Sequence, residues 1–339
     1  FPGAVYLASK DGVQICHEAC GFRRLAPNMP MTLNTMFDLA SLTKPLATVA
    51  AVMVLAQKGA LGLEDRIGDI IHPFQETDKN HITIRQLLSH TSGLPDYRPF
   101  YERLILLPHP QRKKSLLNMI VSERFAAPPE TKYIYSDIGF MILGWIIETV
   151  ANKPLDKFVY DTIYQPLGLR GLFFIPLDTC NIKPDYGFAA TEDCPWRKKI
   201  LKGEVHDDNA YAMGGVAGHA GLFGTASEVH ILLLELLSAY HGFARSGVFD
   251  SHIVNAFFSH QILGRTLGFD VPSGITPSCG KYFSQETVGH LGFTGTSFWI
   301  DLPRSIIVIL LTNRVHPTRD NNKIKEFRPV FHDAIMEDL

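Results

Sequence analysis

Cysteine is scarce in this chain, which has five among its 339 residues. A small and odd number does not build a disulfide scaffold, although Cys180 and Cys194 could pair across a loop. Cys16, His17 and Cys20 lie close together, but odd and even residues of an extended strand point to opposite faces. They also lack the second pair of ligands that a structural zinc site requires. We therefore expect no metal site.

Strong charge and long apolar runs are also missing. The net charge is −2 and the densest basic run is only residues 197–199, so a surface for nucleic acid is not expected. The longest uncharged apolar run, residues 45–57, falls short of the roughly 20 residues that cross a bilayer. No membrane span is expected. The chain begins at Phe1, so the lack of a signal peptide carries no information.

Two catalytic signatures are absent as well. The sequence contains no Gly-x-Ser-x-Gly motif, which argues against an α/β-hydrolase. It contains no His-Glu-x-x-His either, which argues against a zinc protease.

Strand patterns occupy both ends of the chain and helical patterns its middle. We predict strands at residues 4–8, 13–20, 298–301 and 305–312, and helices at 41–59, 84–89, 110–124, 138–150, 225–237 and 323–336. This order predicts a mixed α/β fold of the α+β type, with an antiparallel sheet built from both termini, covered by the first and last helices. The sheet domain would comprise residues 1–75 and 225–339. A mainly helical domain, residues 76–224, would carry a lid-like insertion at about 172–215.

The most informative segment places Ser41 and Lys44 three residues apart at the start of an apolar helical run. Residues at this spacing share a helix face, so the hydroxyl has a built-in base. Pro45 is tolerated only in the first turn, which puts Ser41 at the helix N-terminus. The same spacing recurs at Ser278 and Lys281, but in loop composition. For Ser41 alone, an ordinary N-cap serine is the alternative.

Three segments follow one another along the chain: Ser41-Leu42-Thr43-Lys44, Tyr135-Ser136-Asp137 and His290-Leu291-Gly292. This series resembles the serine β-lactamase and penicillin-binding-protein-like hydrolases, and is most similar to class C. That family has Ser-x-x-Lys, Tyr-x-Asn and Lys/His-x-Gly. The resemblance covers nearly the whole chain, with further similar stretches at residues 87–94, 135–144, 166–169 and 289–301.

The resemblance implies a role for each motif residue. Ser41 attacks the substrate carbonyl, and Lys44 acts as its base, for which its pKa has to fall. Tyr135 passes a proton to the leaving group. The oxyanion hole would consist of the N–H of Ser41 and the N–H of Phe293, next to the substrate-binding Gly292. No cofactor is implied.

Two residues depart from the family pattern. Asp137 replaces the usual asparagine and brings a possible negative charge into the site. His290 replaces the lysine of true β-lactamases and is mostly neutral near pH 7. A substrate carboxylate at the scissile bond would therefore meet little fixed positive charge. We expect weak hydrolysis of penicillins and cephalosporins.

The run Gly203-Glu204-Val205-His206-Asp207-Asp208-Asn209-Ala210, with residues 218–223, looks like a subgroup that includes N-acetylmuramoyl-L-alanine amidases. His206 and Asp207 could shape a substrate-binding pocket; a solvated acidic loop is the alternative. A metal site at His206 and His219 has no recognised ligand spacing.

The resulting hypothesis is a serine hydrolase that forms an acyl-enzyme with cell-wall-derived amides, such as a muropeptide or another small molecule. A carboxylesterase, a D-amino-acid peptidase and a non-catalytic penicillin-binding-like sensor are the alternatives. The resemblance implies a periplasmic or other extracytoplasmic location. The sequence leaves the oligomeric state open.

Overall fold

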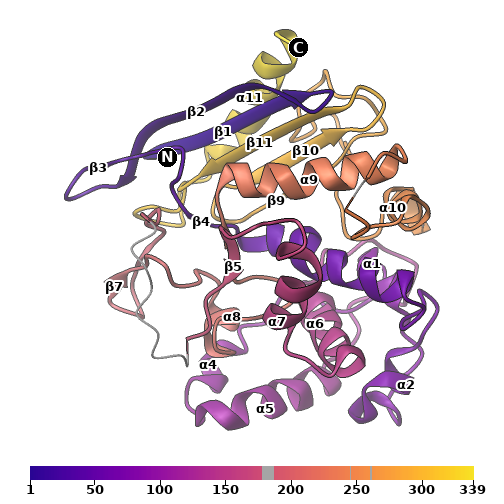
Figure 1. The fold of residues 1–339 in the computed structure, drawn as a ribbon. Coiled ribbons are helices and arrows are strands. Elements are labelled where there is room, and N and C mark those ends of the chain that lie inside the picture. Colours follow the sequence, from indigo (N-terminus) through magenta and orange to yellow (C-terminus); the bar gives the residue numbers. More distant parts are fainter. Residues whose placement is uncertain (178–186, 245, 260–261) are drawn as a thin grey trace.

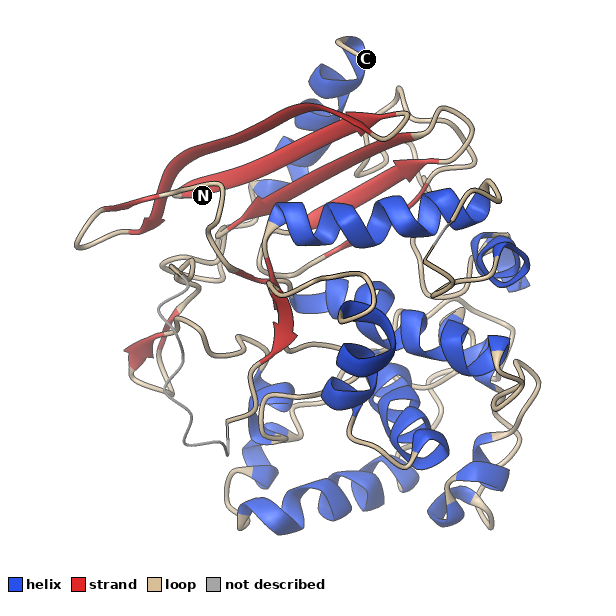
Figure 2. Ribbon diagram, viewed as in Figure 1, coloured by secondary structure: helices blue, strands red, loops and turns tan. Residues whose placement is uncertain are grey.

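A six-stranded antiparallel sheet forms one side of the molecule (Figures 1 and 2). The structure, a computed structural model, describes residues 1–177, 187–244, 246–259 and 262–339. Along the sheet the strands are β3 (Met29–Pro30), β2 (Val13–Arg24), β1 (Gly3–Lys10), β11 (Ile306–Thr312), β10 (Ser297–Asp301) and β9 (Val288–Leu291). Both ends of the chain thus meet in one sheet, as the sequence predicts.

Tight turns set the register of the sheet at its hairpins. Asp11 and Gly12, with φ of 52° and 78°, connect β1 to β2; this left-handed pair suits a two-residue hairpin. Ser305, with φ of 51°, ends the turn between β10 and β11. In the central strand pair, β1 and β11, Leu7 lies opposite Ile309.

Helices cover the sheet on both faces. Every residue of β11 is buried, because α9 (Ala226–Tyr240) lies on one face and α11 (Ile324–Glu337) on the other. Ile307 and Ile309 join the large core, whereas Ile306 and Val308 pack with Met336 of α11. A strand covered on both faces has to be apolar throughout.

The prediction that the first helix covers the sheet is wrong, since α9 takes that place. The helical segment Ala40–Gln57 lies deeper in the molecule, below α9 in Figure 1. By length and composition it could cross a bilayer, but 83% of it is buried inside the fold. A helix that is apolar all round needs cover on every side, and its neighbours are α10 (Ser251–Phe258), α6 (Asp137–Ala151) and α7 (Leu155–Val159).

The predicted helices of the middle region are present. Two of them begin at residues with a side-chain cap: the Thr83 hydroxyl and the Gln86 side chain form a reciprocal capping box for α3 (Ile84–Leu88), and the Ser136 hydroxyl accepts the Gly139 N–H at the start of α6. Thr225 caps α9. Further α-helices among the described residues are α1 (Ala50–Gln57), α2 (Ile67–Ile70), α4 (Tyr101–Leu104), α5 (His109–Val121) and α8 (Asp208–Ala212).

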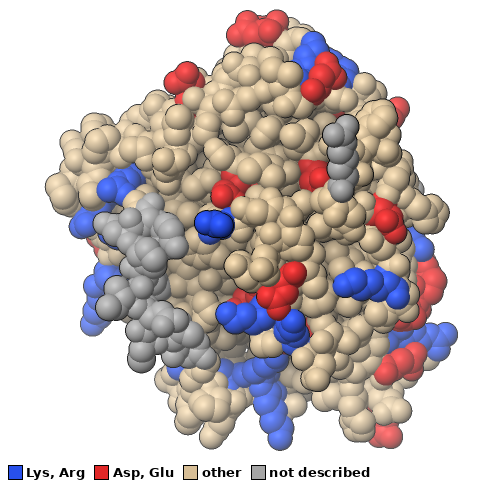
Figure 3. Space-filling model, viewed as in Figure 1, with Lys and Arg blue, Asp and Glu red and all other residues tan. Residues whose placement is uncertain are grey.

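Short strands organise the region that the sequence marks as an insertion. β8 (Leu222–Gly224) pairs with both β4 (Phe37–Asp38) and β5 (Leu172–Phe174), and β6 (Asp193–Cys194) pairs with β7 (Lys199–Ile200). Cys180, the candidate partner of Cys194, lies outside the described residues. The two-domain division and the lid-like role stay predictions. On the face drawn in Figure 3, charged side chains of both signs are interspersed.

Candidate active site

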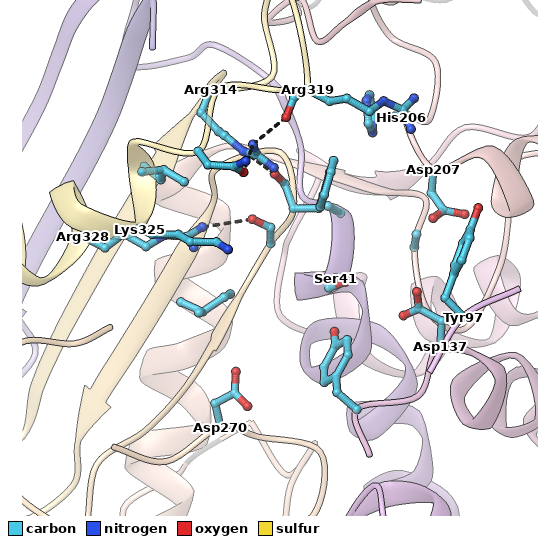
Figure 4. A pocket seen from close by; sticks show the side chains of 18 of the residues that line it. Ser41, Tyr97, Asp137, His206, Asp207, Asp270, Arg314, Arg319, Lys325 and Arg328 are labelled. Carbon is cyan, nitrogen blue, oxygen red and sulfur yellow. Dashed lines mark hydrogen bonds between the residues drawn. The ribbon is translucent and has the colours of Figure 1, made fainter. Parts of the chain in front are cut away.

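The three sequence motifs meet in one cavity of about 760 Å³. Ser41 enters it from the start of the central helical segment, Tyr135 from just before α6, and Gly292 from just after β9. Figure 4 shows Ser41 in the middle, with Lys325 and Arg328 on one side and Asp137 and Asp207 on the other, and Asp270 below the two basic side chains. The cavity therefore lies between the sheet and the helical half of the molecule.

Lys44 is fully buried beside the serine. Its ammonium nitrogen donates hydrogen bonds to Ser41 Oγ at 3.0 Å, to Asp137 Oδ1 at 2.6 Å and to the His219 carbonyl at 3.3 Å. It also lies 4.7 Å from the centre of the Tyr135 ring. The predicted pairing of Ser41 with Lys44 is therefore present, and Ser278 lies in a loop near α11, where Asp333 accepts the Lys281 N–H.

The expectation that the pKa of Lys44 falls is wrong for this resting site. Burial lowers the pKa, but the Asp137 carboxylate and Tyr135 outweigh it and raise the pKa above its usual value. The lysine is therefore an ammonium at neutral pH. Lys44 can act as a base only after its ammonium has transferred a proton to another group.

Tyr135 keeps its proton in the same network. Burial raises the pKa of its phenol, and although Lys44 opposes this, the Asp137 carboxylate adds to the rise. The neighbouring Lys44 and Ser41 side chains act against this rise of the phenol pKa. Neutral tyrosine and charged lysine together can relay a proton from the attacking hydroxyl to a leaving group.

The turn after β9 carries the predicted second oxyanion donor. Gly292 N–H donates to the Thr296 carbonyl, and the buried Arg328 guanidinium binds the carbonyls of Gly292 at 3.0 Å and Thr296 at 2.7 Å. Phe293, between them in the turn, is half exposed and lines the cavity. An oxyanion hole made by the N–H groups of Ser41 and Phe293 stays a prediction.

His290 lies behind the tyrosine and is 2% exposed. Its ring centre is 5.9 Å from that of Tyr135, and its Nδ1 is 3.0 Å from the Leu291 carbonyl. Burial lowers the pKa of His290 to about 4, so the ring is uncharged at neutral pH. Any influence of His290 on a substrate would pass through Tyr135 or through strand β9.

The segment around His206 is a buried wall of the cavity and not a solvated loop. His206 is 4% exposed; its N–H donates to Asp38 and its Nε2 lies 3.2 Å from Glu192. Its ring stacks on Phe293 at 5.6 Å. The Arg197 guanidinium fixes this segment by donating hydrogen bonds to the carbonyls of Val205, His206 and Asp207.

Asp207 and His219 form a second pair beside Lys44. His219 Nε2 lies 2.9 Å from Asp207 Oδ1, and Asp207 also accepts the Ala210 N–H. Despite burial, His219 holds the pKa of Asp207 well below its usual range. In the part of the chain that the structure describes, no group of three or more His, Cys, Asp or Glu residues could hold a metal.

Sequence reasoning missed four basic residues. Arg314, Arg319, Lys325 and Arg328 line the cavity from the loop after β11 and from α11. No local motif marks these residues, because the loop after β11 and the last helix reach the cavity only in the folded chain. Four acidic residues, Asp137, Asp207, Asp208 and Asp270, line the same cavity, and Arg319 is already paired with Glu192 and Asp208. The expectation that a carboxylate at the scissile bond meets little fixed positive charge stays a prediction.

The site and fold together define a serine hydrolase of the β-lactamase fold. A sequence model of the β-lactamase family matches residues 1–329, and the chain belongs to this family. A relative from Salmonella enteritidis PT4, named "Putative D-alanyl-D-alanine carboxypeptidase", is 33% identical, and the match covers 96% of this chain and 81% of the relative.

Solved structures show the same fold. EstCE1, described as a hydrolase with promiscuous acyltransferase activity, superposes with a TM-score of 0.74 at 24% identity, over 96% of this chain and 93% of that one. A penicillin-binding protein from Bacillus halodurans gives 0.72 at 19% identity, over 98% and 96%. At these identities the likeness concerns the fold alone.

Proposed function

We propose that this enzyme is a serine peptidase that releases the terminal residue of a peptide ending in a D-amino acid. The single observation that carries the proposal is the basic wall of the cavity, formed by Arg314, Arg319, Lys325 and Arg328. A terminal carboxylate is the group that such a wall would receive, because hydrogen bonds between ionised partners are the strong ones. The name of the 33% identical Salmonella relative supports the same substrate class.

The chemistry follows from the contacts of Ser41. Its Oγ attacks the carbonyl carbon, and the hydroxyl proton passes through Tyr135 and Lys44 to the leaving nitrogen, so the C–N bond breaks and an amine departs. Water then attacks the acyl ester and restores the serine hydroxyl. Asp137 keeps Lys44 charged between these steps.

Hydrolysis of a muramoyl-alanine amide is the second candidate. The observation that favours it is the buried His206 wall, which belongs to the segment that looks like the amidase subgroup. Either substrate comes from the cell wall and would place the enzyme in an extracytoplasmic compartment.

A panel of four substrates tests the proposal. It comprises an acylated D-alanyl-D-alanine peptide with a free carboxylate, the same peptide amidated at its end, a lactyl-L-alanine amide from a muropeptide, and a short nitrophenyl ester. We expect the free-carboxylate peptide to have the highest kcat/KM. A preference for the lactyl amide would favour the amidase instead, and a preference for the ester an esterase.

The nucleophile is tested separately. A fluorophosphonate probe should label Ser41, and Ser41→Ala should abolish both labelling and turnover. An adduct on Ser278 would contradict the assignment. A burst of acylation without steady turnover on any of the four substrates would point to a non-catalytic sensor.

A further inference from the structure

The backbone around Tyr135 is held on both sides by one residue, His90. The Ile134 N–H donates to the His90 carbonyl at 2.9 Å, and the Ser136 N–H donates to His90 Nδ1 at 2.9 Å. The His90 ring also lies against the Tyr135 ring, with 4.6 Å between centres. These three contacts restrict the movement of the Tyr135 backbone and of its ring.

The protonation state of His90 suits this arrangement. A nitrogen that accepts a backbone N–H carries no proton, so the ring proton is on Nε2. Burial, together with the charge of Lys44, holds the pKa of His90 well below its usual value. The ring is therefore a neutral acceptor, and its tautomer is set by Ser136.

His90 is itself anchored by its own loop. It follows α3 and has φ of 57°, and its N–H donates to the Leu87 carbonyl at 3.2 Å. The same loop binds the Tyr135 segment a second time, since the Ser136 hydroxyl donates to the Pro95 carbonyl at 2.6 Å. The position of the tyrosine thus depends on helix α3 through His90.

We propose that His90 is a positioning residue that fixes the Tyr135 phenol over Ser41 and Lys44. The proposal rests on the catalytic role assigned to Tyr135. His90 does not line the cavity among the described residues, so it acts through the tyrosine and not on the substrate. A misplacement of about 1 Å in a reacting group can cost about a hundredfold in rate.

A matched pair of amide variants tests the contact. The side-chain oxygen of His90→Asn can take the place of Nδ1, and asparagine tolerates a left-handed backbone. His90→Gln reaches about one bond further and leaves the Ser136 N–H without its acceptor. We expect His90→Asn to keep kcat within about fivefold and His90→Gln to lose about a hundredfold, both with little change in KM.

A double-mutant cycle with Tyr135→Phe separates positioning from a merely structural role. If His90 acts through the phenol, His90→Gln should cost nothing further in the Tyr135→Phe background. An equal loss in both backgrounds, or wild-type kcat in His90→Gln, would overturn the proposal. High activity of the Tyr135→Phe single variant would also overturn the proposal, because it would show that the Tyr135 phenol has no catalytic role for His90 to support.

A folding defect is controlled by melting temperature and by His90→Phe. This variant keeps an aromatic ring but has no acceptor, so it replaces His90→Gln if that protein does not fold. It should show the same loss of kcat, and wild-type kcat in folded His90→Phe contradicts the proposal.

Discussion

The Lys44 ammonium lies 2.6 Å from the Asp137 carboxylate, in an ion pair whose lysine is fully buried. The pair spans the start of the central helical segment and the first turn of α6, which are 93 residues apart along the chain. It determines the charge state of the proposed base, because burial alone would favour neutral lysine.

Removing the acid should shift the pH dependence of catalysis. Asp137 raises the pKa of Lys44, so Asp137→Asn should lower it. If neutral Lys44 is needed for acylation, kcat/KM of the wild type rises towards alkaline pH, and the variant should begin this rise at lower pH. The measurement is kcat/KM against pH. Asp161→Asn, from the exposed pair with Lys153, is the control and should leave the profile unchanged. An unshifted profile for Asp137→Asn would exclude Lys44 as the titrating base.

Replacing the lysine should affect both activity and stability. Lys44→Met removes the proton relay, so kcat should fall by at least about a hundredfold. It also leaves the Asp137 carboxylate without its partner, which costs up to about 3 kcal/mol. The double variant Lys44→Met with Asp137→Asn should recover the melting temperature but not the activity. Recovery of both would show that the lysine has only a structural role.

The basic wall should recognise a carboxylate. Lys325 is exposed and lines the cavity, whereas Lys323, two residues earlier, is exposed and does not. Lys325→Gln should raise KM roughly fivefold for a peptide with a free terminal carboxylate, since a partly solvated charge contributes about 1 kcal/mol. The amidated peptide should show no change, and Lys323→Gln should affect neither substrate. An equal effect on both peptides would contradict charge recognition.

A close backbone approach beside the lysine should tolerate no side chain. A Cβ on Gly218 would lie 2.1 Å from the Phe140 carbonyl oxygen, whereas one on Gly139 would meet nothing nearer than 3.5 Å. Gly218→Ala should destabilise the fold by about 1–3 kcal/mol and lower kcat, because the next carbonyl, that of His219, accepts a hydrogen bond from Lys44. Gly139→Ala should change stability by less than about 1 kcal/mol. Thermal unfolding and kcat of the two variants provide the comparison, and similar behaviour of both would contradict the clash.

Local patterns in the sequence determined most elements of the fold and the identity of the central groups. The Thr83 cap, the hairpin at Asp11 and the spacing of Ser41 from Lys44 each depend on only a few neighbouring residues. The antiparallel sheet followed from strands at both ends of the chain.

Tertiary structure alone decided the electrostatics of the site and which helix covers the sheet. Lys44 is charged because Asp137 approaches it from another helix. Arg328 lines the cavity because α11 packs on the sheet, and Arg314 lines it because loop carbonyls of Phe293, Arg319 and Asn321 hold its side chain. The Ser41 segment lies deep in the molecule because it is apolar on every side, which leaves α9 to cover the sheet. Burial and charge depend on neighbours distant in sequence, whereas caps and turns do not.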